Sequence, residues 1–377
     1  MTLLGLVGLL DPLRTEATGA VAECKAAGVQ VVMITGDHAA TAGAIARQLS
    51  ITAPNAPGPV TGEMLETMDD ATLTDRVDML RVYARVAPDQ KIRIVRALQS
   101  RGEFVAMTGD GVTDAPALRQ ADIGIAMGIA GTDVAREAAD MVLLDDNFAS
   151  IVAAVREGRR IYDNIRRFIR YILTGNFAEI WLLFLAPLVG LPFPLLPIHI
   201  LWVNLVTDGL PGLALAAEPA ERNVMARPPR PPDESVCANG LGRHALWVGL
   251  LMGSVSLFTQ GWALHSESPH WQSMTFTVLA LSQLGHVVAV RSERQSIVTL
   301  GLWSNHVLTL AVLATVALQH STLYVPVLQR VFRTAPLTLR ELLQCLGLSA
   351  VTFLAVELEK FLVRRGLLYR GVHHDQR

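Results

Sequence analysis

The sequence has little cysteine and almost no net charge, and both shortages exclude classes of protein. Its three cysteines, Cys24, Cys237 and Cys345, form neither a metal-binding motif nor a disulfide framework. A formal net charge of −2 gives no reason to expect a nucleic-acid partner. The first residues, Met1 to Leu4, lack the basic segment that opens a signal peptide, and we expect them to lie inside a larger protein.

Apolar residues are in excess instead, and they are unevenly placed. Hydrophobic residues make up 51% of the chain and charged residues 18%, which is too apolar for an ordinary soluble protein. Up to about residue 160, short apolar runs alternate with charged helical stretches; beyond it, long apolar segments follow one another. We therefore predict a soluble domain over 1–150, a connecting helix over 151–169, a membrane domain in the lipid bilayer over 170–363, and a tail over 364–377.

The soluble part repeats a unit of strand, polar turn and helix. Strands are expected at 3–10, 29–34, 81–86, 104–107, 123–127 and 141–144, and helices at 15–27, 39–49 and after Pro88. This alternation predicts an α/β fold with a parallel, doubly wound sheet. Such sheets bind ligands at the C-terminal ends of their strands, where these polar residues fall: Asp11, Thr35, Asp37, Thr108, Asp110 and Asp114.

Residues 107–128 contain the most informative of these turns. An apolar run stops at Thr108-Gly109-Asp110-Gly111, where the glycines permit a tight turn. Asp110 and Asp114 then stand at the start of a short helix, a placement that suits a divalent cation holding a phosphoryl group. Taken alone, an ordinary strand-to-helix turn with an aspartate cap would explain the same residues.

Beyond residue 160, six apolar segments each approach the roughly 20 residues that cross a bilayer. They are 170–189, 195–216, 243–264, 271–290, 299–319 and 340–362. The segment from Arg156 to Arg170 is rich in arginine, which predicts a cytoplasmic soluble domain by the positive-inside rule. An even number of spans returns the C-terminus to the same side.

Polar residues inside the first two predicted membrane helices indicate an ion site. Asn176 and Glu179 share one helix face, and Asn204, Thr207 and Asp208 share another. A carboxylate in the bilayer core costs at least ~2.5 kcal/mol, so it needs a partner or a function. Oxygen donors of these kinds suit a hard cation such as Ca²⁺, and the glycines and proline that follow would interrupt the helix and free carbonyl groups. The alternative is a set of polar residues that only holds helices together.

Several ordered motifs occur together in one known family. They are Asp11-Pro12-Leu13-Arg14, Met33-Ile34-Thr35-Gly36-Asp37, Val86-Ala87-Pro88 with Lys91, Thr108-Gly109-Asp110-Gly111-Val112-Thr113-Asp114-Ala115-Pro116-Ala117-Leu118, and the run from Trp202 to Pro211. With these motifs the chain resembles the P-type cation-transporting ATPases, and especially their calcium-pump branch. The resemblance covers essentially the whole chain and implies a HAD-like phosphorylation domain followed by the last six membrane helices.

The resemblance also implies roles for particular residues. Asp110 would ligate Mg²⁺ with support from Asp114, while Lys91, Thr35 and Thr108 would contact the phosphoryl group. The residues implied to hold nucleotide and nearby loops, ATP being the substrate, are Asp11, Gly36 and Asp37. The positions implied to coordinate the transported cation are Asn176, Glu179, Asn204, Thr207 and Asp208. Gln283 stands where two-calcium pumps place a glutamate, so it supplies an amide without charge, and His286 follows one turn later.

Besides Gln283, three features depart from the family pattern. Thr113 replaces the usual asparagine and loses its amide. The phosphorylated aspartate of the family's Asp-Lys-Thr-Gly-Thr motif is absent from these residues. An actuator-type Thr-Gly-Glu-Ser segment is absent as well. Thr61-Gly62-Glu63-Met64 resembles half of one, but we expect it to be a loop before a helix of the same domain. We therefore expect the chain alone to be inactive. It would need an N-terminal portion with the actuator domain, the nucleotide-binding domain and the first membrane helices.

The leading hypothesis is the C-terminal part of an ATP-driven calcium pump in the plasma membrane. Two alternatives stay open: a truncated, non-catalytic membrane protein that binds cations or modulates a pump, and a pump for Mn²⁺, Na⁺ or K⁺. A soluble phosphatase with the same sheet would need a nucleophilic aspartate, and Asp11 lacks the second aspartate two residues later that such enzymes use.

Overall fold

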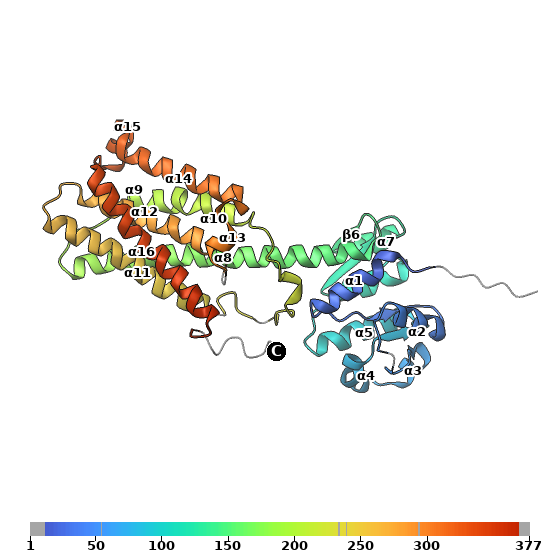
Figure 1. Cartoon of the computed structure of the whole chain (residues 1–377). Coiled ribbons are helices and arrows are strands. Elements are labelled where there is room, and N and C mark those ends of the chain that lie inside the picture. The colour runs from blue at the N-terminus through green and yellow to red at the C-terminus, as the bar shows by residue number, and fades with distance from the viewer. Residues whose placement is uncertain (1–11, 54, 233, 239, 293–294, 369–377) are drawn as a thin grey trace, which may run out of the picture. The chain divides into compact units, whose positions relative to one another are not determined.

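The computed structural model describes residues 12–368 except 54, 233, 239, 293 and 294. Two compact units make up the chain (Figure 1). Unit 1 comprises Met1–Gly158 with Glu221–Glu234, and unit 2 comprises Arg159–Ala220 with Ser235–Arg377. The predicted strand at 3–10 and Asp11 lie outside the described residues.

Unit 1 is built on parallel strands, as its sequence predicts. One sheet has the order β1-β3-β2, from Met33–Ile34, Val82–Ala84 and Val60–Thr61. A second has the order β4-β5-β6, from Ala106–Gly109, Ile123–Met127 and Met141–Leu143. All of these pairings are parallel. The described strands therefore confirm the α/β class but form two three-stranded sheets where one was predicted, because no described strand pairs across the two sets.

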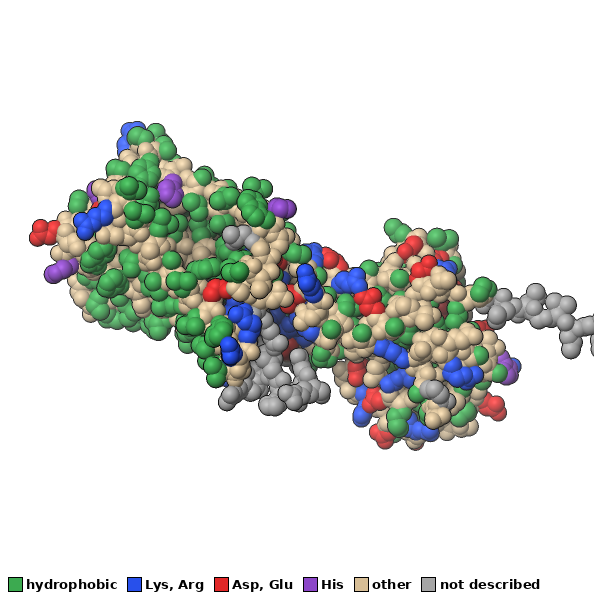
Figure 2. Space-filling model, in the orientation of Figure 1, with side chains coloured by type: hydrophobic (Ala, Val, Ile, Leu, Met, Phe, Trp, Pro, Cys, Tyr) green, Lys and Arg blue, Asp and Glu red, His purple; other side chains and the backbone are tan. Residues whose placement is uncertain are grey.

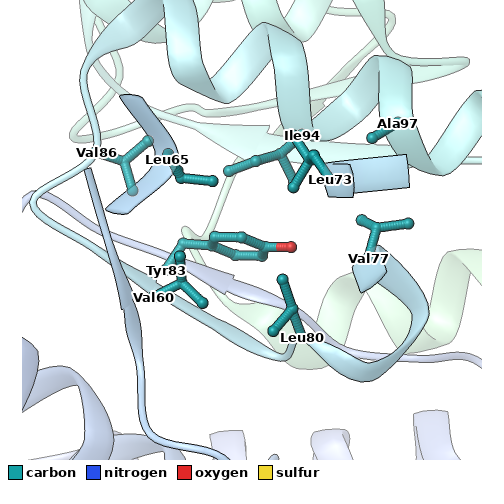
Figure 3. Packing of buried hydrophobic residues seen from close by; sticks show 9 residues of the cluster. All are labelled: Val60, Leu65, Leu73, Val77, Leu80, Tyr83, Val86, Ile94 and Ala97. Atoms are coloured by element: carbon teal, nitrogen blue, oxygen red, sulfur yellow. The ribbon is translucent and has the colours of Figure 1, made fainter. Parts of the chain in front are cut away.

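Short helices connect and cover these strands. They are α1 Thr15–Ala26, α2 Ala39–Gln48, α3 Gly62–Thr67, α4 Asp70–Arg76, α5 Pro88–Ser100, α6 Ala115–Gln120 and α7 Asp133–Ala138, with 3₁₀ turns η1 Val77–Met79, η2 Val112–Asp114 and η4 Val224–Ala226. The ring of Tyr83, fully buried on β3, lies at the centre of an apolar cluster with Leu65, Leu73 and Ile94 (Figure 3). Packing of this kind, rather than strand length, stabilises the first sheet.

The segment Thr61-Gly62-Glu63-Met64 joins β2 to α3 directly, where the sequence suggested a loop. Thr61 caps α3 by accepting a hydrogen bond from the Met64 amide. A side chain at Gly62 would collide with the main-chain oxygen of Arg85. Buried Gln90 donates to the Gly62 carbonyl at 3.0 Å. The glycine is therefore explained by close packing inside unit 1.

Unit 2 consists of helices that expose many hydrophobic side chains (Figure 2). They are α8 Phe148–Leu188, which begins in unit 1, then α9 Pro197–Trp202, the π-helical turn η3 Val203–Thr207, α10 Gly209–Leu215, α11 Leu241–His265, α12 Trp271–Ala289, α13 Ile297–Leu300, η5 Leu302–Ser304, α14 His306–Tyr324, α15 Pro326–Phe332 and α16 Leu339–Arg364. The helix predicted at 299–319 instead runs over α14, because α13 and η5 precede it and Asn305 caps its start.

Within the described residues, four helical stretches are long and apolar enough to cross a membrane: Phe148–Leu188, Pro197–Leu215, Leu241–His265 and His306–Tyr324. The prediction of six counted α12 and α16 as well. Their polar residues, such as Gln283 and Glu359, lower their apolar character, and both of these side chains are buried in unit 2. A helix enclosed by its neighbours needs less apolar surface than one that faces lipid.

A buried ion pair fixes the end of α10 to α12 and α14. Arg291 donates to Glu218 through Nε at 3.0 Å and through Nη2 at 2.8 Å. Asn305 donates to the same carboxylate at 2.8 Å, and Arg291 also reaches the Gly301 carbonyl at 3.0 Å. Both charged side chains are almost completely buried. Such a pair needs both members, because either one alone would be an uncompensated buried charge.

We expect Glu218→Gln to destabilise unit 2 by about 3–5 kcal/mol, the usual cost of removing one member of a buried pair. The measurement is thermal unfolding of the full chain in detergent. Glu267→Gln, at an exposed position, is the matched control and should change the midpoint little. Equal midpoints for the two variants would contradict the role of the pair.

Candidate functional site

The first candidate site lies at the C-terminal end of β4. Lys91 on α5 contacts Asp114 of η2, with 2.5 Å between Nζ and Oδ1, and both side chains are largely buried. The helix bearing Lys91 begins at Pro88, whose missing N–H is tolerated at a first helical position. The folded chain thus pairs Lys91 with Asp114, a contact that the sequence did not predict.

Asp114 also organises the turn that precedes it. Its Oδ2 accepts hydrogen bonds from the amides of Gly111 at 3.1 Å and Asp110 at 3.2 Å. Gly109 has no room for a side chain, because a Cβ there would lie 2.5 Å from the Asp114 Cβ. Burial raises the pKa of the Asp114 carboxyl, but hydrogen bonds from Lys91 and the two amides outweigh burial and leave the pKa below its usual value.

The main chain of Asp110 is held on both sides, while its side chain is exposed. Its amide bonds to Asp114, and its carbonyl accepts from the Thr132 amide at 2.9 Å. An exposed carboxylate on a fixed turn fits Mg²⁺, which uses one or two carboxylates and keeps several waters. No group of three or more His, Cys, Asp or Glu side chains suited to a metal occurs in the described part of the chain.

The Thr35-Gly36-Asp37 turn follows β1 and forms its own group of hydrogen bonds. Thr35 Oγ1 accepts from the Asp37 amide at 3.1 Å, and the Asp37 carbonyl accepts from the Arg85 amide at 3.1 Å. Arg85 adopts a left-handed conformation with φ 52°. Thr35 lies at the end of its strand as predicted. Its hydroxyl oxygen already accepts a hydrogen bond within the turn, and none of the hydrogen bonds among the described residues joins it to Lys91. Thr108 lies half-buried inside β4, and Thr113 is exposed.

The second candidate site lies between α8, η3 and α12 of unit 2. Glu179 on α8 accepts from Asn204 Nδ2 at 3.1 Å and from Gln283 Nε2 at 3.2 Å. The carboxylate is buried, and the two amides come from different helices. One residue predicted from the second membrane helix, Asn204, and one from the fourth, Gln283, are thus brought to Glu179 of the first. Asn176, half-buried one turn before Glu179, makes neither of these hydrogen bonds.

Asp208 and Thr207 bring further oxygen atoms to this place. Gly175 of α8 faces Asp208 and Gln283: a Cβ there would lie 3.1 Å from both Asp208 Oδ2 and Gln283 Nε2. Four of the buried oxygens that have no hydrogen-bond partner among the described residues belong to these side chains: Thr207 Oγ1, Asp208 Oδ1 and Oδ2, and Gln283 Oε1. Unpaired buried oxygens are costly, and a bound cation would satisfy several at once.

The helix carrying these residues is interrupted, although not by the proline alone. Residues Val203–Thr207 form a π-helical turn, and the Asp208 amide bonds to the Val203 carbonyl at 2.8 Å. The α-helix resumes at Gly209, and the hydroxyl of Tyr171 donates to the Thr207 carbonyl at 2.9 Å. Single π-turns of this kind occur frequently at functional sites. The glycines and the proline in the sequence predicted the interruption of the helix. Nothing in the sequence predicted that Tyr171 and Gly175 belong to the site.

Comparison with known proteins assigns the two halves of the chain separately. Residues 2–122 match the family described as haloacid dehalogenase-like hydrolase, and residues 192–362 match the family described as cation transporting ATPase, C-terminus. The chain is 46% identical to a calcium-transporting ATPase of Bacillus subtilis, over 94% of this chain and 40% of that protein.

Similar matches come from other organisms. A probable cation-transporting ATPase F of Mycobacterium tuberculosis is 41% identical over 97% of this chain and 41% of its own length. The human calcium-transporting ATPase type 2C member 1 is 40% identical over 96% of this chain and 39% of its own length. The chain thus spans about two-fifths of the length of the curated relatives it matches.

We expect Asp114→Ala to speed hydrogen exchange at the amides of Asp110 and Gly111 by about 10- to 150-fold, since losing a charge-assisted hydrogen bond costs roughly 1.5–3 kcal/mol. Exchange measured by mass spectrometry on the full chain tests this. Asp122→Ala is the matched control, because Asp122 instead holds the Val105 amide at 2.8 Å. Exchange at Asp110 and Gly111 that is the same in both variants would contradict the role of Asp114.

The same carboxyl should make this turn sensitive to acid. Its folded-state pKa is lowered, so its stabilising contribution is present above the ordinary aspartate pKa and is lost as pH falls below about 4. Thermal unfolding of unit 1, followed from pH 6 to pH 3, should therefore show a smaller decline in Asp114→Asn than in the unchanged chain. Parallel declines would contradict this.

Proposed function

The chain belongs to the P-type cation-transporting ATPases, and from this we propose that it forms the C-terminal part of an ATP-driven pump that exports Ca²⁺ from the cytoplasm. Relatives named as calcium-transporting ATPases support the ion. The observation that carries the proposal is the set of four buried, unpartnered oxygens of Thr207, Asp208 and Gln283 beside Glu179. Carboxylate, hydroxyl and amide oxygens are the ligands that Ca²⁺ prefers.

Glu179 and Asp208 supply the negative charge at this proposed ion site. The side-chain amides of Asn204 and Gln283 each donate a hydrogen bond to Glu179. Their side-chain oxygens are therefore the atoms that can bind an ion. Asn176 would complete the set after a small movement along α8. Because Gln283 carries no charge, two formal negatives remain to balance a divalent ion.

Unit 1 would provide the Mg²⁺ and phosphate half of the catalytic site. Asp110 would ligate Mg²⁺, which when bound supplies positive charge against the phosphoryl oxygens. Lys91, held by Asp114, would meet the phosphoryl group as a mobile point charge. Thr35, Gly36, Asp37 and Asp11 would contact phosphate or nucleotide. The aspartate that carries the phosphoryl group in this family would come from residues that this sequence does not contain.

The proposed pump is an integral membrane protein of the plasma membrane, with unit 1 and the C-terminus in the cytoplasm. The apolar helices of unit 2 and the arginines at the start of the first span support this orientation. Its partner would be the portion of the pump that carries the actuator and nucleotide-binding domains. Residues 1–377 by themselves would hydrolyse no ATP.

Ca²⁺ uptake tests the proposal once the missing portion is supplied. The N-terminal three-fifths of the Bacillus subtilis relative can be joined to this chain and reconstituted in vesicles. We expect ATP-dependent Ca²⁺ uptake and a Ca²⁺-stimulated phosphoenzyme, both reduced at least tenfold by Asp208→Asn, since even outer-sphere changes cost about 10–100-fold in metal sites. The control Glu267→Gln should match the unchanged protein. Stimulation by Mn²⁺, Na⁺ or K⁺ with no effect of Ca²⁺ would overturn the ion assignment.

A second measurement tests the dependence on the missing portion. Purified residues 1–377 in lipid should show no ATP hydrolysis above the background of a Lys91→Ala variant. Turnover that Lys91→Ala removes would show that the chain contains its own nucleophile, and would overturn this part of the proposal.

A further inference from the structure

A chain of buried titratable side chains crosses unit 2 beside the proposed ion site. His244 of α11 and His286 of α12 face each other, with 3.1 Å between their Nε2 atoms. The other nitrogen of His244, Nδ1, lies 2.6 Å from Glu359 Oε2 of α16. Trp247 donates to the second oxygen of the same carboxylate at 3.1 Å. All three members are buried, and neither the ion site nor the phosphate site uses them.

These contacts determine where the protons lie. With Glu359 ionised, His244 must donate from Nδ1, so its Nε2 has a lone pair that accepts. His286 must therefore donate from Nε2, and its Nδ1 has the remaining lone pair. That Nδ1 is fully buried and has no hydrogen-bond partner among the described residues. This series of hydrogen-bonded side chains thus ends, inside unit 2, at a nitrogen that can accept a proton.

We propose that His286, His244 and Glu359 form a proton-transfer chain that accepts one proton at His286 Nδ1 and delivers one to Glu359. A proton bound at Nδ1 forms a new N–H bond, and the proton on His286 Nε2 moves to His244 Nε2. The proton on His244 Nδ1 then moves to Glu359 Oε2. No proton is gained or lost beyond the one that entered. The two hydrogen bonds of His244, to His286 and to Glu359, both survive with their directions reversed.

The charges around His286 favour passing the proton on. Arg170 of α8 and Lys360 of α16 both act on His286 electrostatically, together with His244. Two neighbouring cations oppose a lasting positive charge on the imidazole, whereas Glu359 is the anion at the far end. Lys360 is itself paired with Glu357, with 2.7 Å between Nζ and Oε1. A proton that moves from His286 toward Glu359 therefore moves toward an anion.

Tyr171 connects this chain to the proposed ion site. Its ring centroid lies 5.9 Å from that of His286, and its hydroxyl donates to the carbonyl of Thr207, the neighbour of Asp208. His286 is thus separated from the main chain of the proposed ion site by the ring of Tyr171. This last link rests on the proposed function, whereas the proton chain itself does not.

Nitrogen NMR of the full chain in lipid, with ¹⁵N-labelled histidine, tests the proton chain alone. At neutral pH we expect one histidine with a bare Nδ1 and one with a bare Nε2. On acidification both should exchange tautomers together while infrared spectra show Glu359 becoming protonated. Glu359→Gln should abolish the coupled exchange, and His320→Gln, on α14 outside the chain, should leave it intact.

Two results would overturn the proposal even if a variant failed to fold, because both concern the unchanged chain. One is a stable imidazolium at either histidine with Glu359 still ionised. The other is loss of the N–H signals when Zn²⁺ is added, which would identify a metal site instead. In the reconstituted pump, Glu359→Gln should slow Ca²⁺-triggered proton release by about 100-fold, as expected for a lost acid–base relay. A pump that moves no Ca²⁺ would contradict the proposed function without affecting the NMR result.

Discussion

Unpaired oxygen atoms inside an apolar unit are the constraint on which the second half of the chain depends. Burying Glu179 and Asp208 among helices is costly, and the structure offsets only part of that cost through amides from Asn204 and Gln283. The remaining cost is not offset, because several buried oxygens have no hydrogen-bond partner among the described residues. The π-turn before Asp208 and the absent side chain at Gly175 make this arrangement possible, because they bring three helices close at one level.

In unit 1, by contrast, the buried carboxylate has its hydrogen-bond partners within the protein. Asp114 is satisfied before any ligand arrives, by Lys91 and by two amides of its own turn. That leaves the exposed Asp110 on a backbone whose conformation is already fixed. A phosphate site of the proposed kind would have little ordering entropy left to lose on binding, whereas the oxygens in unit 2 would gain their partners only with the proposed ion. The chain thus combines a preorganised site with an unsatisfied one.

Much of this could be predicted from the sequence, because its signals are local. Residue spacing alone predicts three features: the repeated pattern of strand, turn and helix, the TGDG turn, and the polar helix face with Asn204, Thr207 and Asp208. What could not be predicted depends on contacts between distant segments. Gly175 resembles any helix glycine until Asp208 and Gln283 lie against it, and His244 lies 42 residues from His286. The span predicted at 299–319 was displaced because apolar content alone does not reveal the cap at Asn305.

The glycines of α8 have different consequences for how that helix deforms. No proline interrupts it before Pro187, and about 46 Å of helix separates Phe148 from Glu179 at 1.5 Å per residue. Gly175 is required by its neighbours, but a Cβ at Gly158 would meet nothing within 4 Å. Packing therefore gives no reason for glycine at 158, the last residue that unit 1 contributes before Arg159. A glycine inside a helix costs roughly 0.5–1 kcal/mol relative to alanine, so α8 is weakened at this residue with no packing contact that offsets the cost.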